Sequence, residues 1–181
     1  MIIDSLCVFC GASPGNKAIY IDTASSFGAE LGRHGVHLVY GGGKSGLMGC
    51  VADSVLEAGG KVTGIIPNYL KDRELAHQNL TRLEIVHSMH ERKRRMFELA
   101  DGIVSLPGGV GTLEEVLEII TWKQLGMHNK PIIFLNINGY WDHFNDLILN
   151  TILHGFAKTR TKDLYRMVAH PTEIIPALKL I

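Results

Sequence analysis

The feature that most constrains the fold is a repeated alternation of short apolar runs with longer segments of helical spacing. Each apolar run is long enough for one buried strand and stops at a glycine, a proline or a polar turn. Continuous apolar strands separated by helices predict an α/β fold: a parallel sheet with helices on both faces. The expected strands are residues 6–10, 36–40, 62–66, 80–86, 102–106, 131–135 and 165–169, and the expected helices are 18–31, 47–58, 89–100, 112–125, 141–154 and a last one after Pro171.

Length and composition support one folded unit. The chain has 181 residues, which predicts a single domain over residues 1–181. Its 46% apolar and 20% charged residues exclude a disordered chain.

Charge and cysteine content exclude several functional classes. Eighteen Lys and Arg balance eighteen Asp and Glu, which argues against a general nucleic-acid coat or a polybasic membrane binder. No apolar run approaches membrane-spanning length, and the first residues lack the basic start of a signal peptide. Three cysteines are too few for a disulfide framework, so we expect a reducing, cytoplasmic setting without nucleic-acid or membrane partners.

Three glycine-bearing loops follow predicted strands, at Gly11–Ser13, Gly41–Gly49 and Pro107–Thr112. Ligands of parallel sheets bind at the carboxyl ends of the strands, where glycine allows close approach and a helix N-terminus favours an anion. The three loops together favour a phosphorylated ligand, although short connections often need glycine anyway. Gly41–Gly46 fits G-x-G-x-x-G, but it follows the second strand and is a weak dinucleotide signal. A Walker A loop is excluded, because Leu38 stands where its first glycine belongs.

The predicted helix from Met89 carries two cations within its apolar sector. At 100° per residue, Arg92 and Lys93 fall among the apolar side chains, while the other charges of the helix lie outside. Glu91 with Arg95, and Arg94 with Glu98, have the i,i+4 spacing of solvent-exposed pairs. An inward cation requires a partner: an internal carboxylate, snorkelling at the edge of the sector, or an anionic ligand.

The segment after Pro107 has the pattern of a capping box. Thr112 would be the N-cap and Glu115 the third helical residue that reaches back to it. The alternative puts Glu115 beside the anion-binding loop, where its carboxylate is available for chemistry.

One pair of cysteines and one pair of histidines have the spacing of a functional motif, but neither is a strong signal. Residues three apart in a strand point to opposite faces, so Cys7 and Cys10 are interpreted as core residues rather than a redox pair. His87 and His90 lack further well-spaced ligands, and no metal site is expected. The irregular stretch 68–78 could be a loop that covers a site.

Five motifs follow one another along the chain: Cys7-Val-Phe-Cys-Gly-Ala-Ser13, Gly41-Gly-Gly with Gly46-Leu-Met-Gly49, Met89-His-Glu-Arg-Lys93, Pro107-Gly-Gly-Val-Gly-Thr-Leu-Glu-Glu115 and Ile120-Thr-Trp122. With them the chain resembles the Lonely Guy family of cytokinin-activating phosphoribohydrolases, often labelled lysine decarboxylase-like, over nearly its whole length. The resemblance implies a Rossmann-like fold, a homodimer, no cofactor, and hydrolysis of purine riboside 5′-monophosphates such as AMP to free base and ribose 5-phosphate.

The resemblance implies Arg92 and Glu115 as the catalytic pair. Cleaving an N-glycosidic bond builds positive charge on the ribose, which a carboxylate stabilises or relieves by activating water. Arg92 is too basic for a general acid, so we expect it to orient the nucleotide or to hold Glu115. No acid for the departing base is evident. The implied substrate-binding residues are Glu74, Arg92, Lys93, Gly109, Val110, Gly111, Thr112, Leu113, Glu114, Glu115 and Thr121.

Three alternatives remain at this point. Related folds bind molybdenum cofactor, so the chain could be a non-catalytic nucleotide or molybdenum-cofactor carrier. A dinucleotide oxidoreductase rests on G-x-G-x-x-G alone. A decarboxylase would need a lysine bound to pyridoxal phosphate, and Lys93, beside an arginine, suits an anion better. The Met89 helix, with Met96 and Phe97, is the expected dimer surface.

Overall fold

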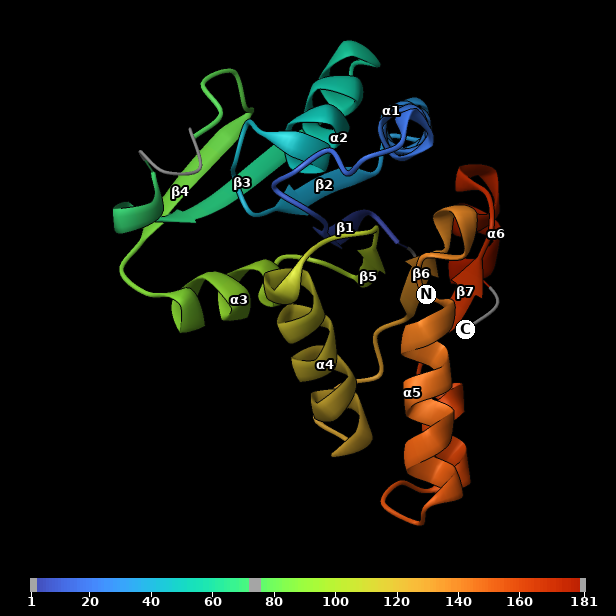
Figure 1. Cartoon of the computed structure of the whole chain (residues 1–181). Helices are drawn as coiled ribbons and strands as arrows, with labels where there is room; N and C mark the ends of the chain where they lie inside the picture. Colours follow the sequence, from blue (N-terminus) through green and yellow to red (C-terminus); the bar gives the residue numbers. More distant parts are fainter. Residues whose placement is uncertain (1–2, 72–75, 180–181) are drawn as a thin grey trace.

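Seven strands form one parallel sheet in the order β4-β3-β2-β1-β5-β6-β7 (Figure 1). The computed structural model describes residues 3–71 and 76–179. The predicted α/β class is confirmed, and each strand falls within about two residues of its expected range. The strands are β1 (Ser5–Phe9), β2 (His37–Tyr40), β3 (Val62–Pro67), β4 (Arg82–Val86), β5 (Gly102–Ser105), β6 (Ile132–Leu135) and β7 (Arg166–Val168).

Helices cover both faces of this sheet (Figure 1), and the sheet separates the hydrophobic core into two layers. Phe27 and Val51 belong to the core layer on one face, and Val116 and Phe144 belong to the layer on the other. Helices α1 (Ala18–Arg33), α2 (Gly46–Glu57) and α6 (Ile174–Lys179) lie on the first face, and α3 (Met89–Glu98), α4 (Val110–Gln124) and α5 (Asp142–Leu153) on the second. Short 3₁₀ turns are η1 (Asn68–Leu70), η2 (Ile137–Gly139), η3 (Thr159–Asp163) and η4 (Pro171–Glu173). Within the described residues, no helix has both the length and the apolar character needed to cross a bilayer.

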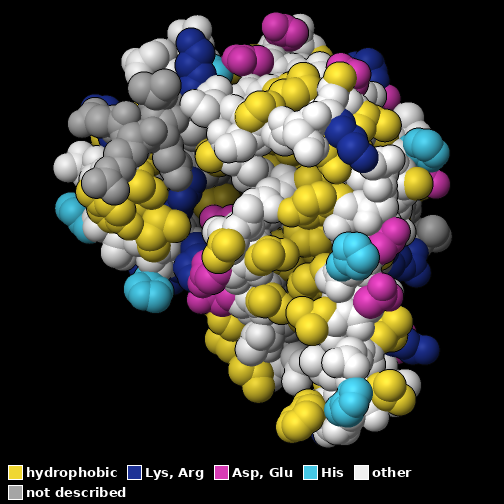
Figure 2. Space-filling view, viewed as in Figure 1, with side chains coloured by type: hydrophobic (Ala, Val, Ile, Leu, Met, Phe, Trp, Pro, Cys, Tyr) yellow, Lys and Arg dark blue, Asp and Glu magenta, His cyan; other side chains and the backbone are white. Residues whose placement is uncertain are grey.

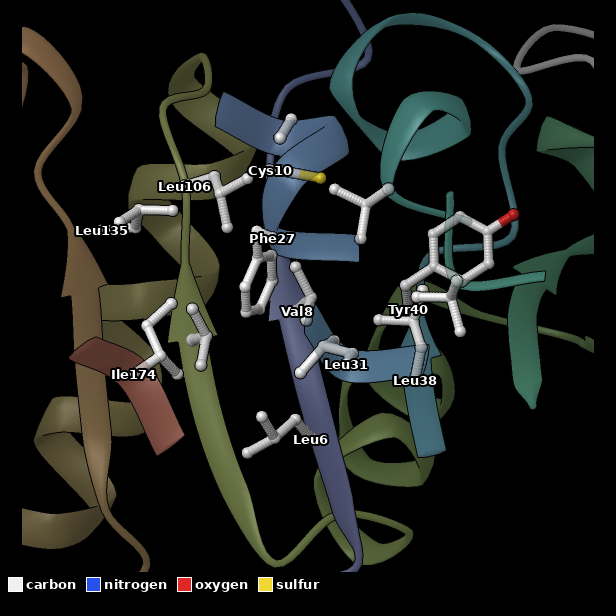
Figure 3. Packing of buried hydrophobic residues seen from close by; sticks show 14 of the residues in the cluster. Leu6, Val8, Cys10, Phe27, Leu31, Leu38, Tyr40, Leu106, Leu135 and Ile174 are labelled. Carbon is white, nitrogen blue, oxygen red and sulfur yellow. The ribbon is translucent and has the colours of Figure 1, made fainter. Parts of the chain in front are cut away.

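Strand β1 shows how the alternation of side chains assigns residues to the two layers. Leu6, Val8 and Cys10 lie in the layer under α1, where Figure 3 shows Val8 beside Phe27. Cys7 lies in the opposite layer. The predicted core position of both thiols is confirmed, and burial raises the pKa of each.

The order of the strands reverses at β1, which lies between β2 and β5. Connections that leave the carboxyl ends of β1 and β5 therefore run to opposite faces and open a crevice between them. The loops at Gly11 and Pro107 meet there, because the N–H of Gly11 donates to the carbonyl of Pro107 at 3.0 Å.

The expected start of α4 is wrong by two residues. Helix α4 begins at Val110 with Gly109 as its N-cap, and no side chain caps it. Thr112 therefore lies inside the helix, and the capping box with Glu115 does not form.

Helix α3 matches its prediction more closely. Arg92, Lys93 and Met96 are buried, as its apolar sector predicted, and the Arg94–Glu98 pair forms at 3.6 Å. Arg95 instead donates to Glu84 on β4. Since Met96 belongs to the core and Phe97 packs edge-to-face on Trp122, the apolar side chains expected to form a dimer surface are used within the subunit.

Candidate active site

A cavity of about 430 Å³ occupies the crevice at the carboxyl ends of β1 and β5. This volume is in the range of small-ligand sites, roughly 300–1,000 Å³. Figure 2 shows cationic and anionic side chains gathered around a hollow on this face of the molecule. The lining residues are Cys10 to Gly15, Tyr20, Leu47, Met48, Met89, Arg92, Pro107, Gly108, Gly109, Gly111, Thr112, Glu114, Glu115 and Tyr140.

Arg92 is held rigidly at one wall of this cavity, with only 4% of its surface exposed. Its Nε donates to the carbonyl of Ile65 at 3.1 Å, and its Nη2 donates to the carbonyl of Gly41 at 2.8 Å. Gly41 directly follows β2, and Ile65 lies in the carboxyl-terminal half of the neighbouring strand β3. The inward orientation predicted for this cation is thus explained by backbone acceptors that fix the guanidinium in place.

The loop that follows β2 is shaped to receive the guanidinium. A Cβ atom at Gly41 would lie 2.0 Å from Nη2 of Arg92, so a side chain there would displace the arginine. The loop is anchored further along, where the hydroxyl of Tyr40 donates to the carbonyl of Gly43 and the N–H of His77 donates to that of Gly42. These bonds make the loop a fixed platform for Arg92.

Lys93 points into the subunit and forms ion pairs with Glu114 and Glu118 of α4. Burial alone would lower the pKa of Lys93, but the hydrogen bonds to the two carboxylates outweigh it and raise the pKa. The amine therefore stays charged, which does not suit a lysine that must lose its proton to form a Schiff base. This cation joins α3 to α4, the two helices that carry Arg92 and Glu115.

The first turn of α4 offers backbone donors to the cavity. The opening N–H groups of a helix have no carbonyl acceptor within it and attract anions. The approach to this turn is close, because a Cβ atom at Gly108 would lie 2.1 Å from Oγ1 of Thr112. No side chain competes for these donors, since Gly109 is the N-cap.

Glu115 lies one turn into α4, half-buried, and lines the same cavity as Arg92. Its carboxylate is close enough to raise the pKa of Cys10, second to the effect of burial, and Arg92 acts on the same thiol in the opposite direction. A carboxylate and a fixed guanidinium thus converge on one hollow beside an anion-attracting helix terminus. This arrangement is able to hold a phosphorylated sugar and to stabilise positive charge on it.

The remaining residues expected at the site fall into three groups. Gly109, Gly111, Thr112 and Glu114 line the cavity. Within the part of the chain that the structure describes, Val110, Leu113 and Thr121 are not among the lining residues, and the Thr121 hydroxyl donates to the carbonyl of Leu117 in its own helix. Glu74 lies outside the described residues. The binding roles of these residues stay predictions.

Sequence reasoning missed two aromatic side chains of the cavity. Tyr20 comes from α1 and Tyr140 from the connection after β6, and their rings meet edge-to-face at 6.2 Å. The position of Tyr140 just after a strand's carboxyl end was the available signal, but its contact with Gly108 joins residues 32 apart and cannot be read from local spacing.

Comparison with known proteins identifies the family to which the chain belongs. Residues 48–178 match the family model described as "Possible lysine decarboxylase". A probable cytokinin riboside 5′-monophosphate phosphoribohydrolase of Oryza sativa subsp. japonica is 44% identical over 167 residues, which is 92% of this chain and 74% of that protein. A cytokinin riboside 5′-monophosphate phosphoribohydrolase of Arabidopsis thaliana is 42% identical over 174 residues, 96% of this chain and 76% of that protein.

Solved structures share the fold at lower identity. The molybdenum cofactor binding protein of Rippkaea orientalis superimposes with a TM-score of 0.74 at 19% identity, covering 99% of this chain and 98% of that chain. At this identity the likeness concerns the fold alone. The sequence relatives therefore bear more strongly on activity than this structural neighbour does.

Proposed function

Since the chain belongs to the family of cytokinin riboside 5′-monophosphate phosphoribohydrolases, we propose that it hydrolyses the N-glycosidic bond of purine riboside 5′-monophosphates. The substrates are AMP and its N6-modified, cytokinin-type derivatives. Water adds across the bond, so that its hydroxyl goes to C1′ of ribose 5-phosphate and its proton to the departing base. The observation that carries the proposal is that Arg92 and Glu115 line one cavity at the N-terminus of α4.

The 5′-phosphate binds at the first turn of α4. The N–H groups from Gly109 to Thr112 supply the donors, and the positive end of the helix supplies the field. Val110 contributes through its backbone N–H, and Leu113 contributes by closing the turn, because its N–H donates to the carbonyl of Gly109 at 3.1 Å. Lys93 does not line the cavity and contributes indirectly, because its ion pair with Glu114 fixes that carboxylate.

Glu115 acts on the ribose. Its carboxylate stabilises the oxocarbenium-like transition state or accepts a proton from the attacking water. Arg92, permanently charged and fixed by two carbonyls, orients the ribose or phosphate oxygens. Glu74 and Thr121 complete the proposed contacts.

The direct test is to incubate the purified protein with AMP and to measure free adenine and ribose 5-phosphate by chromatography. Equal amounts of both products are expected, and adenosine, which lacks the phosphate, is expected to react far more slowly. Failure to release adenine from AMP and N6-prenyladenine from N6-prenylated AMP would refute the function. Binding of molybdenum cofactor without nucleotide hydrolysis would favour the carrier alternative.

We propose that the chain works as one catalytic unit within a homodimer in the cytoplasm, without nucleic-acid or membrane partners. Exposed apolar side chains on the α4–α5 side of the molecule support a contact with a second copy, and Figure 2 shows hydrophobic side chains gathered there. They are Leu117, Leu125, Met127, Leu149, Leu153 and Phe156. Light scattering after size exclusion tests the dimer: the expected mass is twice the 19.9 kDa of one chain.

A further inference from the structure

Tyr140 lines the cavity, and neither the motifs nor the comparisons give it a role. Tyr140 follows η2 in the connection between β6 and α5. Its phenol hydroxyl donates a hydrogen bond to the carbonyl of Gly108, the residue just before the N-cap of α4. The bond joins the carboxyl end of β6 to the loop proposed to bind phosphate.

The first two carbonyls of the loop 107–112, those of Pro107 and Gly108, accept hydrogen bonds from residues outside the loop. The N–H of Gly11 donates to the carbonyl of Pro107 at 3.0 Å, and Tyr140 donates to the carbonyl of Gly108. In a trans peptide the carbonyl and the following N–H point in opposite directions. Holding the carbonyl of Gly108 against Tyr140 therefore turns the N–H of Gly109 away from the tyrosine.

The loop needs such a hold because of its glycines. Gly108 is required for close packing, since a Cβ atom would clash with Thr112. However, a peptide between two glycines rotates with little steric resistance. A rotated Gly108–Gly109 peptide would present carbonyl oxygen where an anion needs N–H, which would repel a phosphate.

The connection that presents Tyr140 is itself tightly built. Asn138 adopts φ 52°, ψ 36°, a left-handed conformation uncommon outside glycine, and is followed by Gly139 at φ 71°. The side chain of Asn136 accepts from the N–H of Trp141 at 2.7 Å and so closes the turn. The position of the phenol is thus set by the backbone on both sides of it.

We propose that Tyr140 is a positioning residue that fixes the Gly108–Gly109 peptide with its N–H available to the substrate phosphate. This inference rests on the proposed function, because it assigns a residue to the phosphate end of that site. Tyr140 acts through the loop and is not itself a catalytic residue. Its effect belongs to binding of the phosphate, in the ground state and the transition state alike.

The test compares Tyr140→Phe with Tyr165→Phe. The first keeps the ring against Tyr20 and removes only the hydroxyl. The second removes the hydroxyl of Tyr165, a buried tyrosine outside the cavity lining, which donates to Asn145 at 3.1 Å. Dissociation constants for AMP, ribose 5-phosphate and adenosine are measured by calorimetry, together with kcat and KM for AMP.

For Tyr140→Phe we expect KM for AMP and the dissociation constants of AMP and ribose 5-phosphate to rise about 3–10-fold, as for the loss of one hydrogen bond. Binding of adenosine and kcat stay unchanged. For Tyr165→Phe we expect a lower Tm without any change in ligand binding. A purely structural role for Tyr140 would move stability without separating phosphorylated from unphosphorylated ligands.

Unchanged affinity for ribose 5-phosphate in Tyr140→Phe, or equal weakening of AMP and adenosine, overturns the inference while leaving the proposed function standing. Wild-type protein that binds AMP no better than adenosine refutes the phosphate site itself. If the variant does not fold, NMR of the wild type decides: the amide resonance of Gly109 is expected to shift on addition of inorganic phosphate, and an unmoved resonance overturns the inference.

Discussion

At the scale of single residues, the site depends on how closely backbone and side chain approach each other. The guanidinium of Arg92 is hydrogen-bonded to the carbonyls of Ile65 and Gly41. It packs so closely on the Cα of Gly41 that a Cβ atom there would lie 2.0 Å from Nη2. The sequence predicted that Arg92 faces inward from the helical period alone. It could not predict the two carbonyls that receive it, since they come from strands 27 and 51 residues away along the chain.

Substitution of Gly41 tests whether this close contact positions Arg92. The added methyl of Gly41→Ala would lie 2.0 Å from Nη2 of Arg92, so the guanidinium must shift. We expect kcat/KM for AMP to fall about 10–100-fold, as misplacement of a positioned group by about 1 Å does. The matched control is Gly28→Ala, which crowds the carbonyl of Val51 between α1 and α2 and is expected to lower Tm while leaving kcat/KM intact. Full activity of Gly41→Ala would show that Arg92 need not stay where the structure has it.

At the scale of elements, the five inner strands were predictable because each is a largely apolar run that is almost wholly buried, whereas the edge strands β4 and β7 are mostly exposed or half-buried. The start of α4 was not predictable, because the capping-box pattern at Thr112 and Glu115 competes with a tertiary requirement. The approach of Gly108 to Thr112 draws the chain into the helix two residues earlier. Glu115 thereby faces the cavity instead of returning to a cap.

The end of α3 is fixed by a lysine from another connection. Nζ of Lys130 donates to the carbonyls of Phe97 and Ala100 at 2.6 Å each and lies 3.9 Å from the centre of the Phe97 ring. We expect Lys130→Met to lower the free energy of unfolding by about 1.5–3 kcal/mol, because two charge-assisted bonds to the helix end are lost. Arg94→Met, which removes one exposed pair of 3.6 Å, is the control and is expected to change stability by less than about 0.5 kcal/mol. Urea denaturation measures both, and equal effects would contradict the assignment.

The pairing of α3 with β4 predicts a dependence of stability on pH. Hydrogen bonding from Arg95 lowers the pKa of Glu84 below its ordinary 4.5. The folded state therefore favours the ionised form of Glu84 more than the unfolded state does. The stabilisation is fully present above pH 4.5 and is lost as the pH falls through the lower, folded-state pKa.

Glu84→Gln is thus expected to be less stable than wild type by about 1 kcal/mol at pH 7. The difference should shrink as the pH falls below 4.5, because wild type then loses the same interaction. Denaturant titrations at pH 7 and at successively lower pH measure it. A difference that stays constant into the acid range would contradict the pairing.

At the scale of the whole molecule, the site exists because the strand order reverses between β1 and β5. That reversal brings together the loops after Cys10 and after Leu106, which lie almost a hundred residues apart in the chain. The sequence predicted a parallel sheet and ligand binding at its carboxyl edge. The strand order, and with it the meeting of Arg92, Glu115 and Tyr140 around one cavity, depends on long-range pairing that no local pattern contains.

The central claim is that the carboxylate of Glu115 acts on the ribose of a bound nucleotide that the rest of the cavity holds. The measurement that tests it most directly is adenine release from AMP by Glu115→Gln, with AMP affinity measured on the same preparation by calorimetry. For Glu115→Gln we expect kcat to fall at least about 100-fold while the dissociation constant of AMP stays essentially unchanged. Adenine release at the wild-type rate, or loss of activity explained entirely by loss of AMP binding, would contradict it.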